Sequence, residues 1–259
     1  MKPATPGTVR VRREGAVARV SLDRGALNVL DRPLGRALAQ AVAEASGDRS
    51  VAVLVLDGGA ARGFSAGVEV ADHVPQTVAD MLAAFHRAVR ALWACECPSI
   101  ALVHGFAMGG GLELALACDQ LVVEKAARLG FPEIRLGCYP PVAAAILPAR
   151  IGWAAANELV LGGEDFTPER ALALGMVNRI CADGAREQAL GELLAPLLRQ
   201  SPAVLREARA ALRLAAGGAQ EEALAAIEAR YLRELMLLRD ANEGIAAFME
   251  KRAPQWQNR

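Results

Sequence analysis

Lysine and aromatic residues are scarce in this sequence, and neither sign of charge is in excess. Lysine occurs only at Lys2, Lys125 and Lys251, so the 29 basic residues are almost all arginine, and aromatic residues make up 4% of the chain. The basic residues are balanced by 29 acidic residues, which gives a formal net charge of zero. A chain without surplus charge has no general attraction for nucleic acid or for an anionic membrane surface. We therefore expect neither as a partner.

Long apolar runs and cysteine motifs are also absent. No uninterrupted apolar stretch reaches the roughly 18 residues that a membrane-spanning helix needs, and residues 1–7 contain no apolar signal core. The five cysteines are odd in number, and Cys95 and Cys97 lack the two-residue gap of a redox or zinc pair. The three histidines are not spaced as metal ligands. These features predict a cytoplasmic protein with reduced cysteines, no metal and no redox cofactor.

Strand and helix patterns alternate through the first part of the 259 residues. Asp31 and Pro33 mark a helix start, with Leu34, Leu38 and Val42 following at helical spacing. Strand patterns occur at residues 9–11, 16–22, 51–56, 99–103 and 121–123, the first two as a hairpin, and further helix patterns at residues 78–93 and 112–117. This alternation is typical of a mostly parallel α/β fold.

Helical patterns dominate the later part of the chain, with one β-rich run at residues 177–180. The predicted helices cover residues 154–161, 168–174, 186–198, 204–214, 219–238 and 241–251. Ser201-Pro202 interrupts this series near residue 200. We therefore expect a core over residues 1–200 and a C-terminal helical region over residues 201–259.

Three consecutive glycines, Gly109 to Gly111, lie between a predicted strand and a predicted helix. Glycines allow a backbone to approach a ligand closely, and the start of a helix presents unpaired N–H groups. The segment lacks the Gly-Lys-Ser/Thr of a phosphate loop and the glycine spacing of a dinucleotide fingerprint. A tightly packed strand-to-helix turn is an equally good explanation of the glycines alone.

Two acidic residues, Glu113 and Glu133, stand in apolar segments. Each alone could be an ordinary surface acid. As a pair they suit the hydration of an activated double bond, in which one group takes a proton from water and another delivers one to carbon. Apolar surroundings raise the pKa of a carboxyl group, which favours such proton transfer near neutral pH.

Five segments of the chain resemble the crotonase (enoyl-CoA hydratase/isomerase) superfamily, in the family's order and over nearly the whole length. They are residues 64–69 (Phe-Ser-Ala-Gly-Val-Glu), 104–119, 131–137, 169–178 and 243–254. The resemblance implies an α/β fold built as a spiral of ββα units, followed by a C-terminal helical region that forms trimers. It also implies an acyl-CoA substrate and a homotrimer or a dimer of trimers.

The resemblance further implies roles for individual residues. The backbone N–H groups of Val68 and Gly110 would form the oxyanion hole for the thioester oxygen. Glu113 would help to activate water, Glu133 would handle the proton on the α-carbon, and coenzyme A would enter only as part of the substrate. Substrate or CoA contacts are expected at Arg62, Ser65, Ala66, Gly109, Tyr139, Phe248 and Lys251. For Arg62, Phe248 and Lys251, a solvated charge or ordinary packing is an equal alternative, and the last two would act across a subunit boundary.

The chain departs from the common family pattern after Glu133. Common hydratases have a glycine-rich loop where this chain has Tyr139-Pro140-Pro141. Pro141 has no N–H group and a fixed φ angle. The change is either neutral or the sign of a reshaped acyl pocket. The double proline resembles the cyclohexa-1,5-diene-1-carbonyl-CoA hydratases of anaerobic aromatic degradation, which implies a cyclic dienoyl thioester as the substrate.

We expect an enzyme of the hydro-lyase class that adds water across the C=C bond of an unsaturated acyl-CoA. An enoyl-CoA isomerase is the nearest alternative, although it uses one principal acid/base and two acids are present. A hydrolase of acyl-CoA or C–C bonds on the same scaffold also stays open. A non-catalytic CoA-binding assembly subunit would not need both glutamates, and Ser65 has no evident His/Asp partners for a serine protease.

Overall fold

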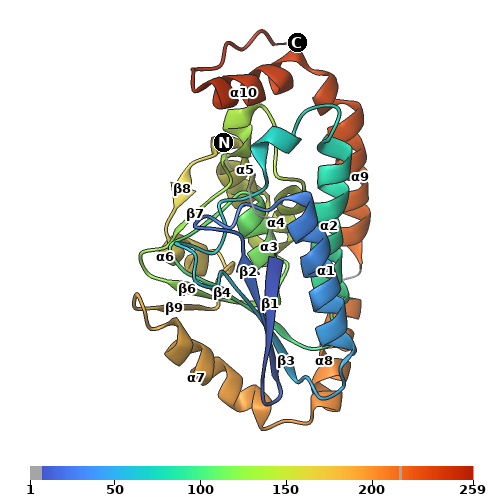
Figure 1. Cartoon of the computed structure of the whole chain (residues 1–259), viewed down its shortest axis with the longest axis vertical. Coiled ribbons are helices and arrows are strands. Elements are labelled where there is room, and N and C mark those ends of the chain that lie inside the picture. The colour runs from blue at the N-terminus through green and yellow to red at the C-terminus, as the bar shows by residue number, and fades with distance from the viewer. Residues whose placement is uncertain (1–7, 216–217, 259) are drawn as a thin grey trace.

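The computed structural model describes residues 8–215 and 218–258, with a six-stranded sheet at the centre of the fold (Figure 1). Strands β1 (Thr8–Glu14) and β2 (Val17–Asp23) form an antiparallel hairpin at one edge. Gly15 in its turn has a φ of 62°, a conformation that glycine adopts without steric cost. The hairpin predicted from the sequence is therefore confirmed.

The rest of this sheet is parallel. Its order is β1-β2-β3-β4-β6-β9, with β3 (Val53–Asp57), β4 (Ser99–Val103), β6 (Gln120–Glu124) and β9 (Arg179–Cys181). Strands β3 and β4 are buried along their whole length, as their continuous apolar runs predicted. Strand β3 begins two residues later than predicted, because the N–H of Val51 bonds to the carbonyl of Asp48 in a turn.

A second, three-stranded sheet was not predicted. It contains β5 (Phe106–Met108), β7 (Arg128–Gly130) and β8 (Asp165–Phe166), in that order. These strands have two or three residues each, too few to show a two-residue periodicity in the sequence. The backbone of Ala107 in β5 pairs with Ser65, which fixes the glycine-rich loop beside the start of the next helix.

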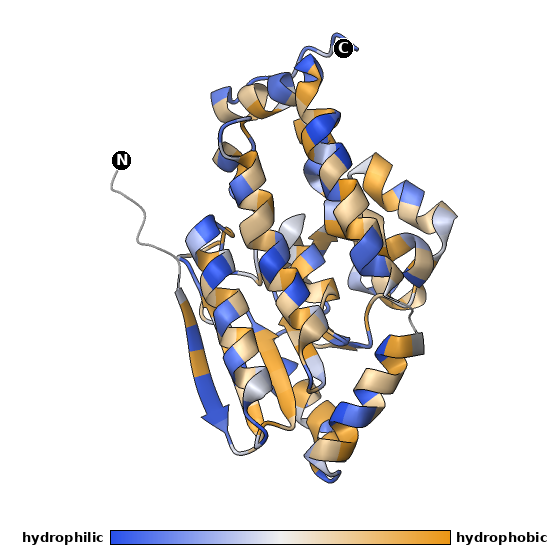
Figure 2. Cartoon of the chain, turned by 90° about the vertical axis from the view of Figure 1, so that its right-hand side faces the viewer, coloured by the Kyte–Doolittle hydropathy of each residue, from blue (hydrophilic) through white to orange (hydrophobic). Residues whose placement is uncertain are grey.

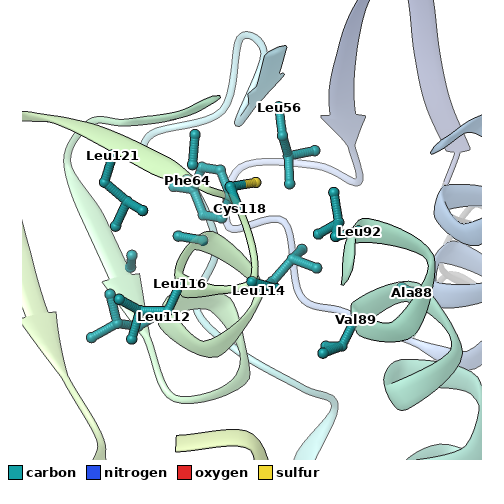
Figure 3. Close-up of a cluster of buried hydrophobic side chains, with 14 of the residues drawn as sticks. Leu56, Phe64, Ala88, Val89, Leu92, Leu112, Leu114, Leu116, Cys118 and Leu121 are labelled. Carbon is teal, nitrogen blue, oxygen red and sulfur yellow. The ribbon is translucent and has the colours of Figure 1, made fainter. Parts of the chain in front are cut away.

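Helices α1 (Arg32–Gly47) and α2 (Val78–Ala94) pack lengthwise against each other beside the large sheet (Figure 1). Asp31 caps α1 by accepting the N–H of Leu34 at 2.8 Å, as the sequence predicted. Helix α3 (Gly110–Leu116) is completely buried. Its leucines lie among side chains from β3, β6 and α2 (Figure 3).

Helices dominate the later part of the chain, as predicted. They are α4 (Pro141–Ile151), α5 (Trp153–Gly162), α6 (Pro168–Ala173), α7 (Arg186–Leu198), α8 (Pro202–Ala215), α9 (Ala219–Arg233) and α10 (Arg239–Glu250). The single helix predicted over residues 219–238 is wrong. Helix α9 ends at Arg233, a 3-10 helix η3 (Leu235–Leu237) follows, and the extended backbone of Leu238 starts a new direction.

Helix α4 was also not predicted, because its double proline resembles a loop. Pro141 occupies the first helical position, where a missing N–H group costs nothing and a φ near −65° suits the helix. Helix α4 therefore starts at Pro141, one of the two prolines that had suggested a loop. This brings the N–H groups of the first turn of α4 to the end of α3 that carries Glu113.

Helix α8 buries Arg206 and Arg209 and exposes Leu212 and Leu214. Hydrophilic and hydrophobic residues alternate along this helix, at the lower right of Figure 2. Arg206 is 6% exposed and donates to the carbonyls of Ser46 and Asp48 at the end of α1. Arg209 donates to the carbonyls of Leu92 and Cys95 at the end of α2. Each arginine therefore satisfies the last carbonyls of another helix.

Apolar side chains are correspondingly exposed on α8. Val204, Leu212 and Leu214 are 63%, 74% and 82% exposed. Within the described part of the chain, no helix combines the length and apolar character needed to cross a bilayer.

Candidate active site

A pocket lies between α2, the start of α3, the 3-10 helix η2 (Pro132–Leu136), the start of α4 and helix α9. It encloses about 540 Å³ of empty space, including its open mouth. The lining residues are Ala66, Gly67, Val68, Val70, His73, Met81, Leu82, Phe85, Gly109, Gly110, Glu113, Pro132, Glu133, Leu136, Tyr139, Pro141 and Tyr231. The pocket therefore brings together both acids and both amide-bearing residues that the sequence singled out.

Glu113 lies in the first turn of α3 and is 2% exposed. Its Oε1 accepts the N–H of Ala143, in the first turn of α4, at 2.8 Å. Burial raises the pKa of Glu113 to about 7, while the N–H groups of Ala143 and Val142 oppose that rise by stabilising the carboxylate. The start of α4 thus provides donors for one ionised carboxyl group in an apolar pocket.

Glu133 lies on η2 and has different surroundings. Burial raises its pKa well above the usual range, and the nearby charge of Glu113 raises it further. Among the described residues, no donor contacts the buried Oε2 of Glu133. Two carboxyl groups this close cannot easily both ionise. The proton that they share therefore belongs on Glu133, and the negative charge on Glu113.

The glycines beside these acids are required by close contacts. Gly109 has a φ of 50°, and a methyl group on it would overlap Oε1 of Glu133. A methyl group on Gly110 would lie 2.5 Å from Cγ2 of Val68 and 3.5 Å from the Val68 nitrogen. The described residues offer no acceptor to the N–H of Val68 or of Gly110. Two neighbouring backbone donors are therefore free at the pocket wall.

Ser65 holds this wall in place from behind. It is fully buried, its hydroxyl donates to the carbonyl of Asn28 at 2.7 Å, and it accepts the N–H of Gly67 at 3.1 Å. Its carbonyl accepts the N–H of Met108 at 3.0 Å. Ser65 does not line the pocket, whereas the exposed Ala66 lies at the rim. The geometry gives Ser65 a positioning role rather than direct contact with a ligand.

Three other residues named from the sequence lie outside the pocket lining. Arg62 is exposed on the loop that precedes Ser65. Phe248 is 53% exposed on α10, and Lys251 ends that helix with a φ of 56°. Helix α10 packs on η2, so close that a methyl group on Gly244 would overlap the carbonyl of Leu136. These residues are therefore not brought together with the two acids within one chain.

The pocket also contains residues that the sequence did not identify. Met81, Leu82 and Phe85 come from the apolar side of α2, which the helical spacing had already marked without a function. His73 is 8% exposed, and burial lowers its pKa, which favours a neutral ring. Tyr231 comes from α9, far along the chain, and no local signal connects it with the pocket.

Within the described ranges, no three His, Cys, Asp or Glu side chains are grouped so that they could hold a metal ion.

Comparisons with known proteins identify the family of the chain. The sequence model of the enoyl-CoA hydratase/isomerase family matches residues 12–259. The chain is 34% identical to cyclohexa-1,5-dienecarbonyl-CoA hydratase of Thauera aromatica, over 99% of this chain and 98% of the relative. It is 35% identical to 2,3-dehydroadipyl-CoA hydratase of Escherichia coli, over 96% and 98%.

Solved structures give the same result. The crystal structure of an enoyl-CoA hydratase from Mycobacterium avium subsp. paratuberculosis superposes with a TM-score of 0.86 and 28% identity, covering 99% of this chain and 100% of the other. The fold and the site define a CoA-thioester enzyme of the crotonase fold. The chain belongs to the enoyl-CoA hydratase/isomerase family, in the hydro-lyase class.

Proposed function

We propose that this protein adds water across the α,β double bond of an enoyl-CoA thioester. One observation supports the proposal most strongly. Two buried carboxyl groups with unequal hydrogen bonding face one pocket, beside two neighbouring backbone N–H groups that lack acceptors. Hydration needs a base for water, an acid for carbon and donors for the thioester oxygen. The pocket offers one carboxyl group for each proton transfer and two backbone donors for the oxygen.

In this proposal the N–H groups of Val68 and Gly110 hold the thioester oxygen. Negative charge develops on that oxygen as the enolate forms, so both donors bind the transition state more tightly than the substrate. One such donor is typically worth about 10²–10³ in rate. The side chain of Val68 takes no part, because the donor belongs to the main chain.

The two acids then divide the proton transfers. The carboxylate of Glu113 takes a proton from water as the water oxygen bonds to the β-carbon. The protonated Glu133 gives its proton to the α-carbon, so H and OH are added and the π bond is lost. Glu113 is then protonated and Glu133 ionised, and a proton passed between them restores the starting state. The helix α4 donors support this division, because they favour the ionised form of Glu113.

Within this reaction class, we propose a compact cyclic dienoyl thioester as the substrate. The relative from Thauera aromatica and the double proline support it. The relative from Escherichia coli is equally similar, but its named substrate has a free carboxylate at the far end of the acyl chain. Among the described residues, no lysine or arginine lines this pocket, and burial favours a neutral His73. The apolar lining therefore suits a hydrocarbon ring better than an anion.

Arg62, Ala66, Phe248 and Lys251 remain proposed contacts of the CoA moiety. Ala66 and Arg62 lie on the loop at the pocket mouth, and Arg62 offers an exposed guanidinium to phosphates. Phe248 and Lys251 lie on α10 outside the lining, so in this proposal they contact the CoA bound by a neighbouring subunit.

Incubation in H₂¹⁸O tests the proposed function. Crotonyl-CoA and cyclohexa-1,5-diene-1-carbonyl-CoA are supplied separately, and products are analysed by mass spectrometry. We expect a hydroxyacyl-CoA that carries ¹⁸O. A shifted double bond without label would identify an isomerase instead, and free CoA with a labelled acid would identify a hydrolase. If the protein binds the CoA thioesters but leaves them intact, it is a binding subunit.

A further inference from the structure

One end of the pocket is closed by an aromatic wall. Ala66 is exposed at the mouth, where a CoA chain can leave the protein. Tyr231 also lines the pocket but is only 1% exposed, so its ring forms a stretch of wall that is closed to solvent. Tyr139 lies against it, with ring centroids 5.1 Å apart at an angle of 74°. An acyl group that reaches this side of the pocket therefore meets a pair of packed rings.

Hydrogen bonding and packing hold the two rings. The Tyr139 hydroxyl donates to the carbonyl of Ile227 on α9 at 3.1 Å. Tyr231 packs in one buried cluster with Cys138, whose thiol donates to the carbonyl of Glu133 at 3.4 Å. Tyr139 thus ties the segment between η2 and α4 to α9, and Tyr231 of α9 packs back against that segment.

The space behind Tyr231 is filled as well. Tyr231 belongs to a buried apolar cluster with Val78, Met81, Leu82, Cys138 and Met236. Protein interiors are packed as densely as organic crystals, so a ring in such a cluster cannot move aside cheaply for a longer ligand. The ring of Tyr231 is therefore held in place by its packing.

We infer that Tyr231 sets the maximum length of the acyl group, with Tyr139 as its support, so that short or ring-shaped acyl groups fit and extended chains do not. This inference rests on the proposed function only in taking the pocket as the acyl site. The aromatic faces suit a flat unsaturated ring, against which they can stack.

Three variants test it: Tyr231→Ala, Tyr231→Phe and Leu224→Ala. Leu224 is a matched control, because it is fully buried on the same helix α9 but faces the main core and does not line the pocket. The measurement is kcat/KM for crotonyl-CoA and for trans-dec-2-enoyl-CoA, after circular dichroism has established folding. We expect the wild type to prefer crotonyl-CoA by about 100-fold or more, the upper part of the range for steric discrimination in apolar pockets.

Tyr231→Ala should reduce this preference by about tenfold or more, while Tyr231→Phe and Leu224→Ala keep it. An unchanged preference in folded Tyr231→Ala would overturn the inference, and so would a wild type that uses both substrates equally. If Tyr231→Ala does not fold, Tyr139→Leu replaces it. This variant should also reduce the preference for crotonyl-CoA, and an unchanged preference would overturn the inference.

Binding of saturated acyl-CoA separates this inference from the proposed function. Butanoyl-CoA and decanoyl-CoA are compared by calorimetry in the wild type and in Tyr231→Ala. If no substrate is hydrated but the wild type still binds only butanoyl-CoA and Tyr231→Ala binds both, the proposed reaction fails and the length limit holds. Equal binding of both ligands by the wild type would reject the length limit, whatever the reaction.

Discussion

Glu113 and Glu133 face the same pocket but differ in the partners of their carboxyl oxygens. Glu113 receives an N–H from the first turn of α4, and Glu133 has a buried oxygen without a donor. We predict that Glu113→Gln and Glu133→Gln each lower kcat by about 10²–10⁴, because each removes one proton-transfer group. Acyl-CoA affinity, measured by calorimetry, should change little.

Glu207→Gln is the control for these two variants, since Glu207 is exposed on α8 and far from the lining residues. Its kcat should equal that of the wild type. If either pocket variant keeps full activity, that glutamate does not transfer a proton in the slow step.

The rate should depend on pH with a limb near neutrality. Burial raises the pKa of Glu113 to about 7, and burial together with the charge of Glu113 raises the pKa of Glu133 well above its usual value. Because the proposed reaction needs ionised Glu113 and protonated Glu133, kcat should fall as the pH drops below about 7. It should fall again at high pH, when Glu133 loses its proton. A kcat measured from pH 5.5 to pH 9.5 that does not change would contradict this assignment.

The carboxyl group of Glu113 should also make the free energy of unfolding depend on pH. Catalysis needs its ionised form, whereas folding favours its protonated form. A pKa raised from 4.5 to about 7 means that the folded protein binds the Glu113 proton more tightly than the unfolded chain. The stabilisation is complete below about pH 4.5 and is lost as the pH rises through 7. Urea unfolding at pH 5 and pH 8 should show a loss on the order of 3 kcal/mol, by the conversion of pKa shifts. Glu113→Gln should lack that loss.

Only part of the site could be predicted from the sequence at the scale of residues. Glu113 and Glu133 are conspicuous because acids are rare in apolar segments, and the glycines mark the backbone donors. The buried position of Ser65 could not be predicted. The local sequence from Phe64 to Ala66 does not show whether the serine hydroxyl points toward a ligand or, as observed, toward the backbone of Asn28. Tyr231 is part of an ordinary helical pattern, and only the docking of α9 gives it a function.

At the scale of elements, α8 stabilises the ends of α1 and α2 through two buried arginines. Arg209 is 7% exposed, forms an ion pair with Asp119 at 2.7 Å and donates to carbonyls at the end of α2. We predict that Arg209→Gln lowers the free energy of unfolding by about 3–5 kcal/mol, since it removes one of the two arginines that pair with Asp119 and takes a buried donor from the carbonyls at the end of α2. Chemical denaturation followed by circular dichroism measures the change.

Arg36→Gln is the matched substitution, because Arg36 is exposed on α1. It should change the free energy of unfolding by less than about 0.5 kcal/mol. A loss of the same size in both variants would mean that the carbonyl contacts of Arg209 carry no special stabilisation.

Elements with long, uniform patterns were predicted well, whereas the small second sheet and helix α4 were not. The strands β3 and β4 and the helices α2, α7 and α8 follow from apolar runs or helical periodicity. The small sheet of β5, β7 and β8 has strands too short for a pattern. Helix α4 was hidden by Pro140-Pro141, because proline is usually read as a helix breaker although it is favoured at a first helical position.

For the whole molecule, the exposed side of α8 is the feature that needs a partner. Val204, Leu212 and Leu214 are exposed apolar side chains on one helix. We predict a homotrimer or a dimer of trimers, with a mass three or six times the 27.3 kDa of one chain, by size exclusion with light scattering. Leu212→Glu should shift the mass toward one chain if this surface is the interface. A monomeric wild type would reject the prediction.

The division of the chain at residue 200 stays a prediction. Residues 201–259 include α9, which packs on α4 and supplies Tyr231 to the pocket. The C-terminal region therefore does more than extend a surface for association. It contributes a wall to the pocket that the preceding residues begin.

Tyr231 follows both glutamates and both backbone donors in the sequence, and this has a consequence for the growing polypeptide. During translation, N-terminal regions fold first. Both glutamates and both backbone donors are synthesised before α9, so a nascent chain that ends before α9 lacks the wall that Tyr231 supplies. The inferred limit on acyl length can therefore operate only after α9 has been made and has packed against the preceding residues.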